Sequence, residues 1–545
     1  MGTTAEYRRL FDRITLTGFI ILVTIVIGVL CWGIYYSRHY EGILTIDAMN
    51  QAQVARHLFR GEGLTTSFLK PVSILLGNYS VPTPDCYISP LPVLILSRFL
   101  KVIGLNDFAV LGYSVFWAFF AGILLLLLSR MLFHHLIIAL LVFLNYMFNI
   151  GVLESSFSGL SMTVISCILL IVIWLYYVRN RSSVVWTMIF GILAGILYLS
   201  EFDFLFLAVP LGVLTVIDSK GNRWPHALVF LFAFVLVALP WMIRNAVVTG
   251  NPFFSLRWLD FKAFSLPFPG NKITRDFAVS SFASTLPMTI LWNKFLMFNR
   301  LMYSLWLSLS LSLLLPLFLA GGLLRFQDAR WGRAMRLAII LFFSQLALIA
   351  AGNGDFARLL SFMPLIVVGG MAGFIQLLAD LKLKTEKRYW LMISILCCVN
   401  FFPGLISLVY GLPEQRYISA AFSKDEAALL KEAGTMDKIR RMMKDDEVVV
   451  SDIPWAVAWY AGRKAVWIPW EIEQMKAIKQ EVKNLRFLHL SPMIFRYPGV
   501  ENAGPWREIY RSGMVPEWLE VDRGILLPGD HLFMGDIIFE RLDLE

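Results

Sequence analysis

Residues 106–128 read NDFAVLGYSVFWAFFAGILLLLL, and after Asp107 this stretch contains no charged side chain. The hydrocarbon core of a bilayer is about 30 Å thick and a helix rises about 1.5 Å per residue, so about 20 apolar residues span it. We therefore predict a transmembrane helix here. Similar apolar runs recur through the first 410 residues and predict about eleven spans, at roughly 14–36, 106–128, 136–152, 158–178, 184–200, 203–217, 227–243, 297–324, 337–351, 359–379 and 389–410.

The composition of the whole chain agrees with a membrane protein. Of its 545 residues, 58% are hydrophobic and 16% are charged, and the mean hydropathy is +0.67. Soluble domains average about 45–50% apolar and about 25% charged residues, so an ordinary soluble enzyme is excluded. The 43 Phe and 17 Trp exclude a disordered chain. Five Cys are too few for a disulfide framework in a chain of this length.

Basic residues predict how the spans are oriented, because short loops rich in Lys and Arg stay in the cytoplasm. Every second short connection is basic, and these connections contain Arg8, Arg9, Arg13, Arg130, Arg179, Arg181, Lys220, Arg223, Arg325, Arg330, Arg333, Arg336, Lys382, Lys384, Lys387 and Arg388. An odd number of spans then predicts a protein of the cytoplasmic (inner) membrane. Its N-terminus would be cytoplasmic and its C-terminal segment extracytoplasmic. The net charge of +9 is thus a topology signal and not a sign of nucleic-acid binding.

The chain divides into a membrane domain and a soluble domain. The membrane domain, 1–410, contains two long outer segments at 37–105 and 244–296. From 411 to 545 the charges are evenly mixed, which predicts a small α/β domain outside the membrane.

Short patterns within these segments predict their secondary structure. In the soluble domain, the expected strands are EVVVSD (447–452), AVWIP (465–469) and RFLHLS (486–491), with a helix at EIEQMKAIKQEV (471–482). In the first outer segment, AMNQAQVARHLF (48–59) has helical periodicity, whereas 88–104 is apolar but interrupted by two prolines. Both are expected to lie in the plane of the membrane interface.

The motifs of common soluble enzymes are absent: the sequence has no Walker loop, GxSxG elbow, HExxH or CxxC site. Ionisable residues instead gather at the expected outer ends of spans and in the outer loops. Because charges at such depth are costly, they are functional candidates. They are Asp47, Asp85, Glu154, Glu201, Asp203, Arg244, Asp355 and Arg358.

Seven segments, in order, give the chain a resemblance to the bacterial GT-C membrane glycosyltransferases, the group of protein-mannosyltransferase-like and aminoarabinose-transferase-like enzymes. The first has an acidic residue just beyond the first span, as in that family's first outer loop. The segments are IDAMNQAQVARHLFRGEGLTTS (46–67), PDCYISPLPVLIL (84–96), FSGLSMTVISCILLIV (157–172), GILAGILYLSEFDFLFLAVP (191–210), LPWMIRNAVVTGNPFF (239–254), FARLLSFMPLIVVGG (356–370) and VVVSDIPWAVAWYAGRKAVWIP (448–469).

The resemblance implies a mainly helical GT-C architecture and a hexosyl- or pentosyltransferase. A sugar on a polyprenyl phosphate would pass, with inversion, to a glycan, lipid or protein acceptor at the outer face. Asp47 matches the family's first-loop acid and is expected to act as general base. Arg244 and Arg358 are both expected to bind substrate, and either of them could hold the lipid phosphate. A divalent cation held by Asp47 and Asp85 is the alternative.

The chain also departs from the family pattern. Ala48 follows Asp47 where many relatives have a second acid, and Ser89-Pro90-Leu91-Pro92 replaces a His-Pro-Pro or Pro-Pro-Leu element. Glu201 and Asp203, expected to bind substrate, stand in a Ser-Glu-Phe-Asp sequence without the Arg that relatives often have.

Each candidate residue also has a structural interpretation. Asp47 would be an N-cap, since Asp is favoured there. Arg358 would pair with Asp355 or anchor in the interface, and Arg244 would be an interface anchor beside Trp241. Glu201 and Asp203 would only end a span and face water. Glu154 would lie at a solvated helix end, and Asp85 would be an ordinary residue of a turn.

Two other functions remain open at this point. One is a transporter or lipid flippase, although such proteins place their sites near the midplane between repeats. The other is a catalytically inactive GT-C relative that acts as a scaffold. For a transferase, we expect the 411–545 domain to be a lid or an acceptor platform.

Overall fold

The computed structural model describes most of both expected domains. The described residues are 25–34, 37, 42–43, 45–74, 82–220, 222–255, 287–308, 313–351, 356–381, 386–410, 434–469, 471–495, 504–512, 520–526 and 537–543. The expected span at 14–36 is therefore described only as the helix Ile25–Ile34. Asp355, one of the candidate residues, lies outside the described residues.

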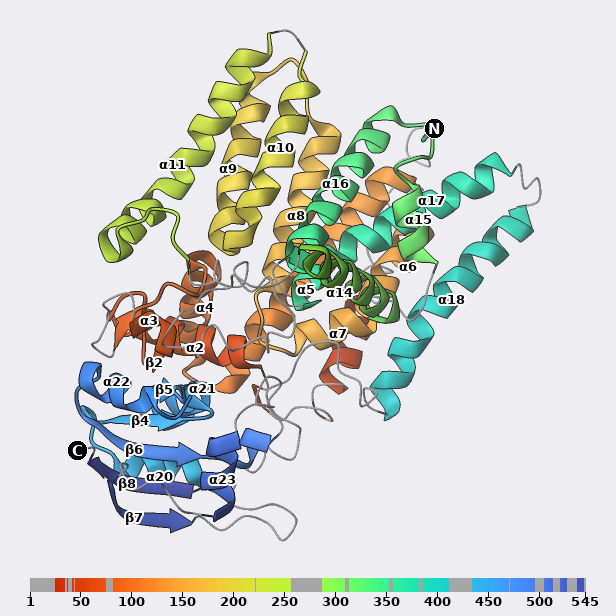
Figure 1. The fold of residues 1–545 in the computed structure, drawn as a ribbon. Coiled ribbons are helices and arrows are strands. Elements are labelled where there is room, and N and C mark those ends of the chain that lie inside the picture. Colours follow the sequence, from red (N-terminus) through yellow and green to blue (C-terminus); the bar gives the residue numbers. More distant parts are fainter. Residues whose placement is uncertain are drawn as a thin grey trace.

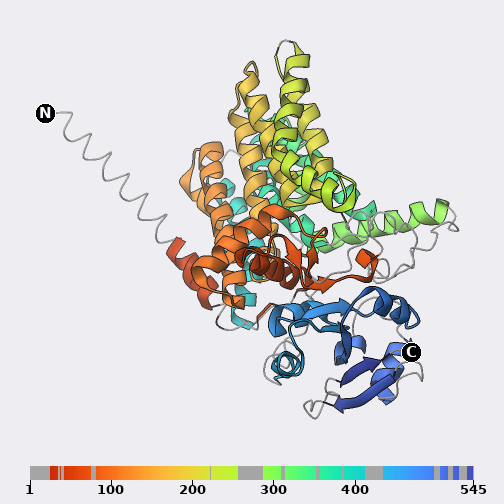
Figure 2. The same ribbon diagram turned by 90° about the vertical axis from the view of Figure 1, so that its left-hand side faces the viewer.

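The molecule has a large helical region and, at one end of it, a region built on a β-sheet (Figure 1). The view turned by 90° shows the same two regions, one above the other (Figure 2). The principal helices of the helical region are α5 (Asp107–Phe133), α6 (Leu136–Met147), α7 (Ile150–Ser156), α8 (Met162–Val178), α9 (Val184–Ser200), α10 (Leu205–Ile217), α11 (Arg223–Thr249), α14 (Pro287–Ser308), α15 (Leu314–Ala320), α16 (Ala329–Ala351), α17 (Met363–Asp380) and α18 (Glu386–Tyr410). Two short 3-10 helices, η1 (Phe202–Phe204) and η2 (Phe356–Phe362), precede α10 and α17.

Several of these helices are long and apolar enough to cross a membrane. In the described part of the chain there are five: Asp107–Phe133, Arg223–Thr249, Ala329–Ala351, Phe356–Asp380 and Arg388–Ile406. A sixth is formed if α6 and α7, bent by 59°, are one broken span, and further apolar helices are shorter. The chain is thus a multi-pass membrane protein. The expected span at 297–324 is covered by two helices, α14 and α15, and the total of eleven spans stays a prediction.

Close helix packing in this region depends on small residues. Gly191 and Gly195 of α9 face α11, and a Cβ at Gly191 would lie 2.4 Å from the carbonyl oxygen of Phe230. A Cβ at Gly195 would lie 2.7 Å from Cβ of Val237. Small residues let helix backbones approach closely in membranes, where association depends on packing. These two glycines therefore fix how α11 sits against α9.

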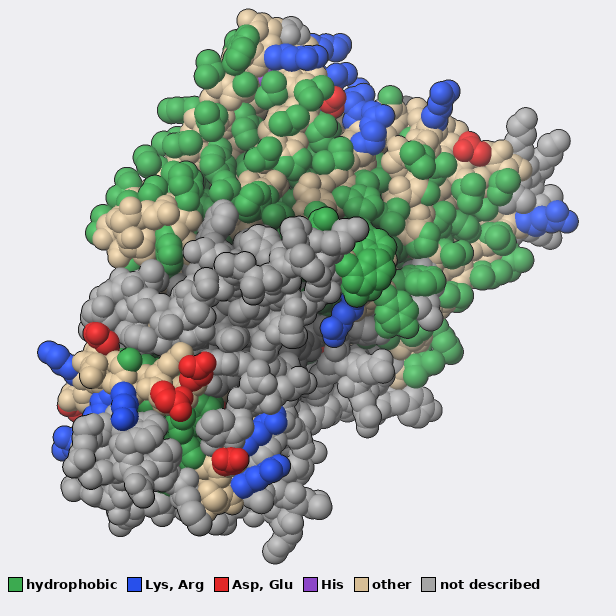
Figure 3. All heavy atoms as spheres, viewed as in Figure 1, with side chains coloured by type: hydrophobic (Ala, Val, Ile, Leu, Met, Phe, Trp, Pro, Cys, Tyr) green, Lys and Arg blue, Asp and Glu red, His purple; other side chains and the backbone are tan. Residues whose placement is uncertain are grey.

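The basic loops meet at the end of the helical region that is opposite the sheet. Arg179 and Arg333 both approach Asp218, at 3.2 Å and 4.0 Å, and the amide of Lys220 donates to the carbonyl of Arg181. Blue side chains also gather along this end in the space-filling view, above a mostly apolar surface (Figure 3). The loops that share a basic character in the sequence are therefore neighbours in space.

The first outer loop forms α2 (Ile46–Phe59), the short α3 (Pro71–Ile74) and α4 (Pro90–Ile103), between the two regions. Pro90 and Pro92 were expected to interrupt the apolar segment, but they do not. They lie in the first turn of α4, where a missing N–H costs nothing because that donor has no partner inside the helix. The strands β1 (Thr65–Thr66) and β3 (Thr83–Pro84) pair antiparallel in the same loop.

The C-terminal sheet has six strands in the order β2-β5-β4-β6-β8-β7. The expected strands are confirmed as β4 (Val448–Ser451), β5 (Lys464–Trp467) and β6 (Leu485–Leu490), and the expected helix as α22 (Gln474–Glu481). Two antiparallel strands, β7 (Glu520–Leu526) and β8 (Ile537–Asp543), extend one side. At the other edge stands β2 (Phe68–Leu69), which comes from the first outer loop and pairs parallel with β5.

Candidate active site

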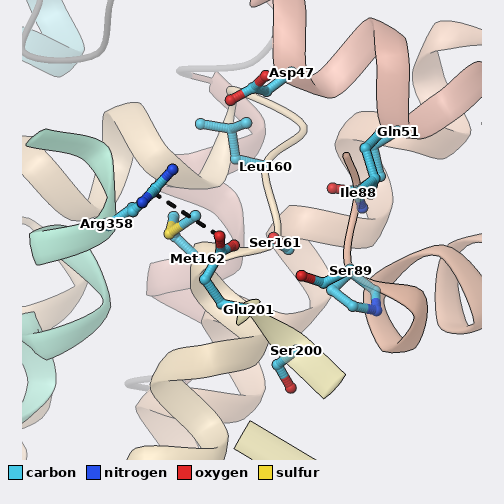
Figure 4. Close-up of a pocket in the computed structure, with 11 residues that line it drawn as sticks. Asp47, Gln51, Ile88, Ser89, Leu160, Ser161, Met162, Ser200, Glu201 and Arg358 are labelled. Carbon is cyan, nitrogen blue, oxygen red and sulfur yellow. Dashed lines mark ion pairs between the residues drawn. The ribbon is translucent and has the colours of Figure 1, made fainter. Parts of the chain in front are cut away.

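A cavity lies where α2, the segment before α4, the α7–α8 connection, the end of α9 and η2 meet (Figure 4). It is lined by Asp47, Gln51, Ile88, Ser89, Pro92, Leu160, Ser161, Met162, Ser200, Glu201 and Arg358. Its volume of about 20 Å³ holds a water-sized group.

Asp47 reaches the cavity from the first turn of α2. The helix begins at Ile46, its N-cap is Thr45, and the Thr45 hydroxyl donates to the carbonyl of Ser158 (3.2 Å). Asp47 is therefore not the N-cap, and the capping interpretation is wrong. Asp47 lies in the first turn of α2, at the helix end that carries partial positive charge.

Arg358 faces two carboxylates. Its Nη1 atom makes an ion pair with Asp203, and its Nε atom lies 4.0 Å from Oε1 of Glu201. All three side chains are buried, so Arg358 is not an interface anchor reaching toward the headgroups. Glu201 and Asp203 do not merely end a span in water either, since both are held by this arginine. Figure 4 shows Arg358 pointing toward Glu201, with Asp47 on the side of α2.

Local backbone geometry explains the position of the two acids. Glu201 is the extended residue that ends α9 (φ −156°, ψ 122°), and the chain then makes the single turn of η1. The amide of Phe202 donates to the Ser89 hydroxyl (3.2 Å), and the Phe202 ring stacks on Trp241 at 5.7 Å. Phe202 is thereby fixed between α4 and α11, and the acids on either side of it point to Arg358.

Arg244 belongs to a different group of charges, which we call the basic cluster: Lys70, Asp85 and Arg244. Arg244 Nη2 donates to the carbonyl of Leu64 (3.0 Å), and its guanidinium lies over the Trp241 ring. Asp85 donates its own amide to the same Leu64 carbonyl (2.9 Å). Lys70 is buried with its ammonium against the Tyr87 ring, within electrostatic range of Asp85.

Asp85 stabilises the turn before α4, as its loop position suggested. Its Oδ2 atom accepts hydrogen bonds from the amides of Ile88 (2.7 Å) and Tyr87 (3.2 Å). Burial raises the pKa of this carboxyl, while those hydrogen bonds and the charges of Lys70 and Arg244 oppose the rise. Asp85 thus connects the basic cluster to Ile88 and Ser89, which line the cavity.

The structure separates the residues that the sequence grouped together. Asp47, Glu201, Asp203 and Arg358 form one group, which we call the acidic pocket, whereas Asp85 and Arg244 stand in the basic cluster. Glu154, expected at a solvated helix end, is instead buried in α7 and does not line the cavity. Within the residues that the structure describes, no three His, Cys, Asp or Glu side chains gather as metal ligands.

Lys70 is the residue of the basic cluster that the sequence analysis missed. The available signal was its place in the outer segment at 37–105, on the side of the membrane where short loops lack basic residues. Long loops obey that rule weakly, so Lys70 could not be distinguished from other lysines without its position in space.

Comparisons with known proteins identify the fold. No protein-family model and no curated protein sequence matches the chain. The structure is similar to two crystal structures of ArnT from Cupriavidus metallidurans, one in the apo state and one bound to undecaprenyl phosphate. Each is 10% identical, and each match covers 96% of this chain and 98% of that chain, with TM-scores of 0.53 and 0.54. The expected GT-C architecture is confirmed.

Proposed function

We propose that this membrane protein transfers a sugar from a polyprenyl-phosphate donor to an acceptor at the outer face of the cytoplasmic membrane, with inversion at the anomeric carbon. The observation that carries the proposal is the pairing of an acidic pocket with a neighbouring basic cluster. It occurs on a fold shared with ArnT, which has been crystallised with undecaprenyl phosphate. The basic loops at the far end of the helical region would then face the cytoplasm.

The net charge of each group indicates which part of the donor it binds. Arg358 is matched by Glu201 and Asp203, and with Asp47 the acidic pocket has a formal excess of negative charge. A phosphate would be repelled there, whereas sugar hydroxyls would find carboxylate acceptors. In the basic cluster, Lys70 and Arg244 outnumber the single carboxylate. We therefore assign the phosphate to the basic cluster and the sugar to the acidic pocket.

This assignment changes the expected role of Arg358. A guanidinium held between two buried carboxylates compensates their charge and orients them, since unpaired buried charges are costly. Arg358 would thus shape the sugar subsite. Phosphate binding falls to Arg244, as one of the two expectations had it, together with Lys70.

Asp47 is proposed to be the general base. As the acceptor oxygen forms its bond to the anomeric carbon, its proton passes to the Asp47 carboxylate. The bond from that carbon to the phosphate oxygen breaks, and its electron pair leaves with polyprenyl phosphate. Lys70 and Arg244 stabilise the charge that develops there. The donor would enter from the bilayer, because its tail stays in hydrocarbon, while the acceptor approaches from the aqueous side.

The test is turnover by purified full-length protein in native lipid extract. A panel of polyprenyl-phosphate sugars is supplied, and release of free polyprenyl phosphate is followed. Wild type and Glu473→Gln, an exposed acid on the C-terminal domain, should release lipid phosphate, whereas Asp47→Asn should not. Donor binding without release from any sugar, in the presence of an envelope extract as acceptor, would favour the scaffold. Lipid movement across vesicles without release would favour a flippase.

A further inference from the structure

The C-terminal domain holds the first outer loop by backbone pairing. Phe68 and Leu69 of β2 stand in register with Ala465 and Val466 of β5, and the amide of Ala465 donates to the carbonyl of Ser67 (2.9 Å). Lys70 is the next residue along the chain. The Lys70 backbone therefore directly follows an edge strand of the C-terminal sheet.

The Phe68 side chain strengthens this attachment. Its ring is buried between two tryptophans of the C-terminal domain, with centroids 6.1 Å from Trp455 and 5.9 Å from Trp467, both edge-on. Aromatic pairs of this kind contribute beyond the area they bury. Two residues of strand are a weak attachment alone, so Phe68 is the side chain that makes it stable.

A second attachment holds α2, the helix that carries Asp47. Arg56 of α2 donates from Nη1 to the carbonyl of Trp459 (2.8 Å) and from Nη2 to that of Ala458. Both carbonyls belong to a π-helix, Val457–Ala461, whose end leaves carbonyl groups in need of donors. Burial lowers the pKa of Arg56 to about 10, so the guanidinium stays charged at neutral pH.

The same π-helix also holds the start of α5. Trp459 Nε1 donates to one oxygen of Asp107 (2.7 Å), and the Tyr460 hydroxyl lies 3.0 Å from the other. From within the C-terminal domain, Arg440 donates to the carbonyls of Tyr460 and Ala461. One short helix thus receives an arginine from each side of the domain junction.

We infer that the C-terminal domain positions the donor site, through Arg56 for Asp47 and through Phe68 for Lys70. This inference rests on the proposed function, and it differs from the expected lid or acceptor platform. A lid would touch the rim of the site and leave its parts in place. Here one domain fixes the backbone on which the proposed base and the proposed phosphate ligand both stand. Arg56 and Phe68 are positioning residues, because neither lines the cavity.

The experiment compares matched pairs of variants in the full chain. Arg56→Ala is paired with Arg440→Ala, because both remove an arginine that donates to carbonyls of the same π-helix, but only Arg56 belongs to α2. Phe68→Ala is paired with Phe539→Ala, which removes a buried ring from β8 of the same sheet. Turnover and the Kd for undecaprenyl phosphate are measured, together with hydrogen exchange of 46–59 and 65–74.

Arg56→Ala should lower kcat by about a hundredfold, as expected for a small displacement of a reacting group, without weakening undecaprenyl phosphate binding. Phe68→Ala should raise that Kd by about tenfold, a change of about 1.4 kcal/mol. Hydrogen exchange should rise in residues 46–59 of Arg56→Ala and in residues 65–74 of Phe68→Ala. It should rise in neither segment of the controls Arg440→Ala and Phe539→Ala.

Three outcomes would overturn the inference: equal effects of Arg56→Ala and Arg440→Ala, effects confined to the KM for the acceptor, or unchanged exchange in both segments. If Arg56→Ala does not fold, Arg56→Lys replaces it. The kcat of Arg56→Lys should be lower than that of wild type and of Arg440→Ala, but above zero. If hydrogen exchange changes as expected but the wild-type protein shows no turnover, the proposed function is rejected while the positioning by the C-terminal domain still stands.

Discussion

The acidic pocket and the basic cluster lie side by side but are built in opposite ways. In the pocket, one guanidinium serves two acids, and a third acid stands on α2 across the cavity. In the cluster, two cations face one acid, which is itself occupied with the turn before α4. Phe202, Trp241 and Ser89 join the two groups through a ring stack and a hydrogen bond.

The difference shows that the sign of local charge, and not the mere presence of arginine, separates the two roles. Arg244 and Arg358 look equivalent in the sequence, since each lies near an end of an apolar run. Their surroundings give one of them a surplus of positive charge and the other a deficit. The variants below test whether the two groups can be disabled separately.

The largest effect is expected from the acidic pocket. Asp47→Asn removes the proposed base while keeping the size of the side chain, so kcat should fall by about 10²–10⁴-fold. Binding of undecaprenyl phosphate should be unchanged, because the phosphate contacts lie in the basic cluster. The measurement is single-turnover release of lipid phosphate alongside a binding assay. Retained turnover at normal protein abundance would remove Asp47 from the mechanism.

A loss of stability is expected next, from Arg358→Met. This change leaves Glu201 and Asp203 buried without their cation, and breaking such a pair typically costs about 3–5 kcal/mol. Thermal unfolding in detergent should show the loss. Adding Glu201→Gln and Asp203→Asn should restore much of the stability without restoring activity. If Arg358→Met stays stable and loses only phosphate binding, the two groups have been assigned the wrong way round.

A smaller effect is expected in the basic cluster. Lys70→Met or Arg244→Met should each weaken undecaprenyl phosphate binding by about 10–100-fold, the range for one charge-assisted hydrogen bond. Asp85→Asn should leave binding equal or tighter, since it removes the opposing charge. Titration of the lipid phosphate at two salt concentrations is the measurement. Equal affinity for all four proteins would contradict the assignment of the phosphate.

The smallest effect is expected from pH, through His57 on α2. Its ring nitrogens lie 2.9 Å from the hydroxyls of Thr65 and Ser67, and burial lowers its pKa to about 4, against the opposing charge of Glu62. The unfolded chain takes up a proton near the ordinary value of about 6.5. The stabilisation from neutral His57 is therefore complete above about pH 6.5 and is lost as the pH falls from there toward 4.

His57 should affect the basic cluster and not the acidic pocket, because its partners Thr65 and Ser67 lie in the segment just before Lys70. On acidification, the affinity for undecaprenyl phosphate should fall before the fold is lost. The difference between wild type and His57→Gln in unfolding temperature should shrink between pH 7 and pH 5. A constant difference across that range would show that His57 has the same pKa in the folded and the unfolded protein.

The sequence predicted the parts of the molecule that depend on local patterns. Apolar runs indicated membrane helices, and alternation at 447–452, 465–469 and 486–491 indicated β4, β5 and β6. The residues of the acidic pocket were also identified, because charge at the end of an apolar run is unusual. Their pairing was not, since the ion pair of Arg358 with Asp203 joins two residues that are 155 positions apart in the chain.

What could not be predicted depends on contacts between distant segments. A strand of two residues such as β2 has no periodicity to detect, and its partner strand lies in the other domain. The role proposed for Lys70 depends on that strand, which directly precedes it, and on its electrostatic effect on Asp85. The separation of Arg244 from Arg358 likewise follows from helix packing and not from any residue near them in the chain.

The pairing of β2 with β5 also sets an order for biosynthesis. The two strands are separated by about 400 residues, and at about 5–20 residues per second a ribosome needs roughly 20–80 s to make that length. During this time the first outer loop has been synthesised, but its sheet partner does not yet exist. A nascent chain truncated before residue 464 therefore has no template for the Lys70 backbone, and the proposed phosphate site is completed only after most of the protein has been made.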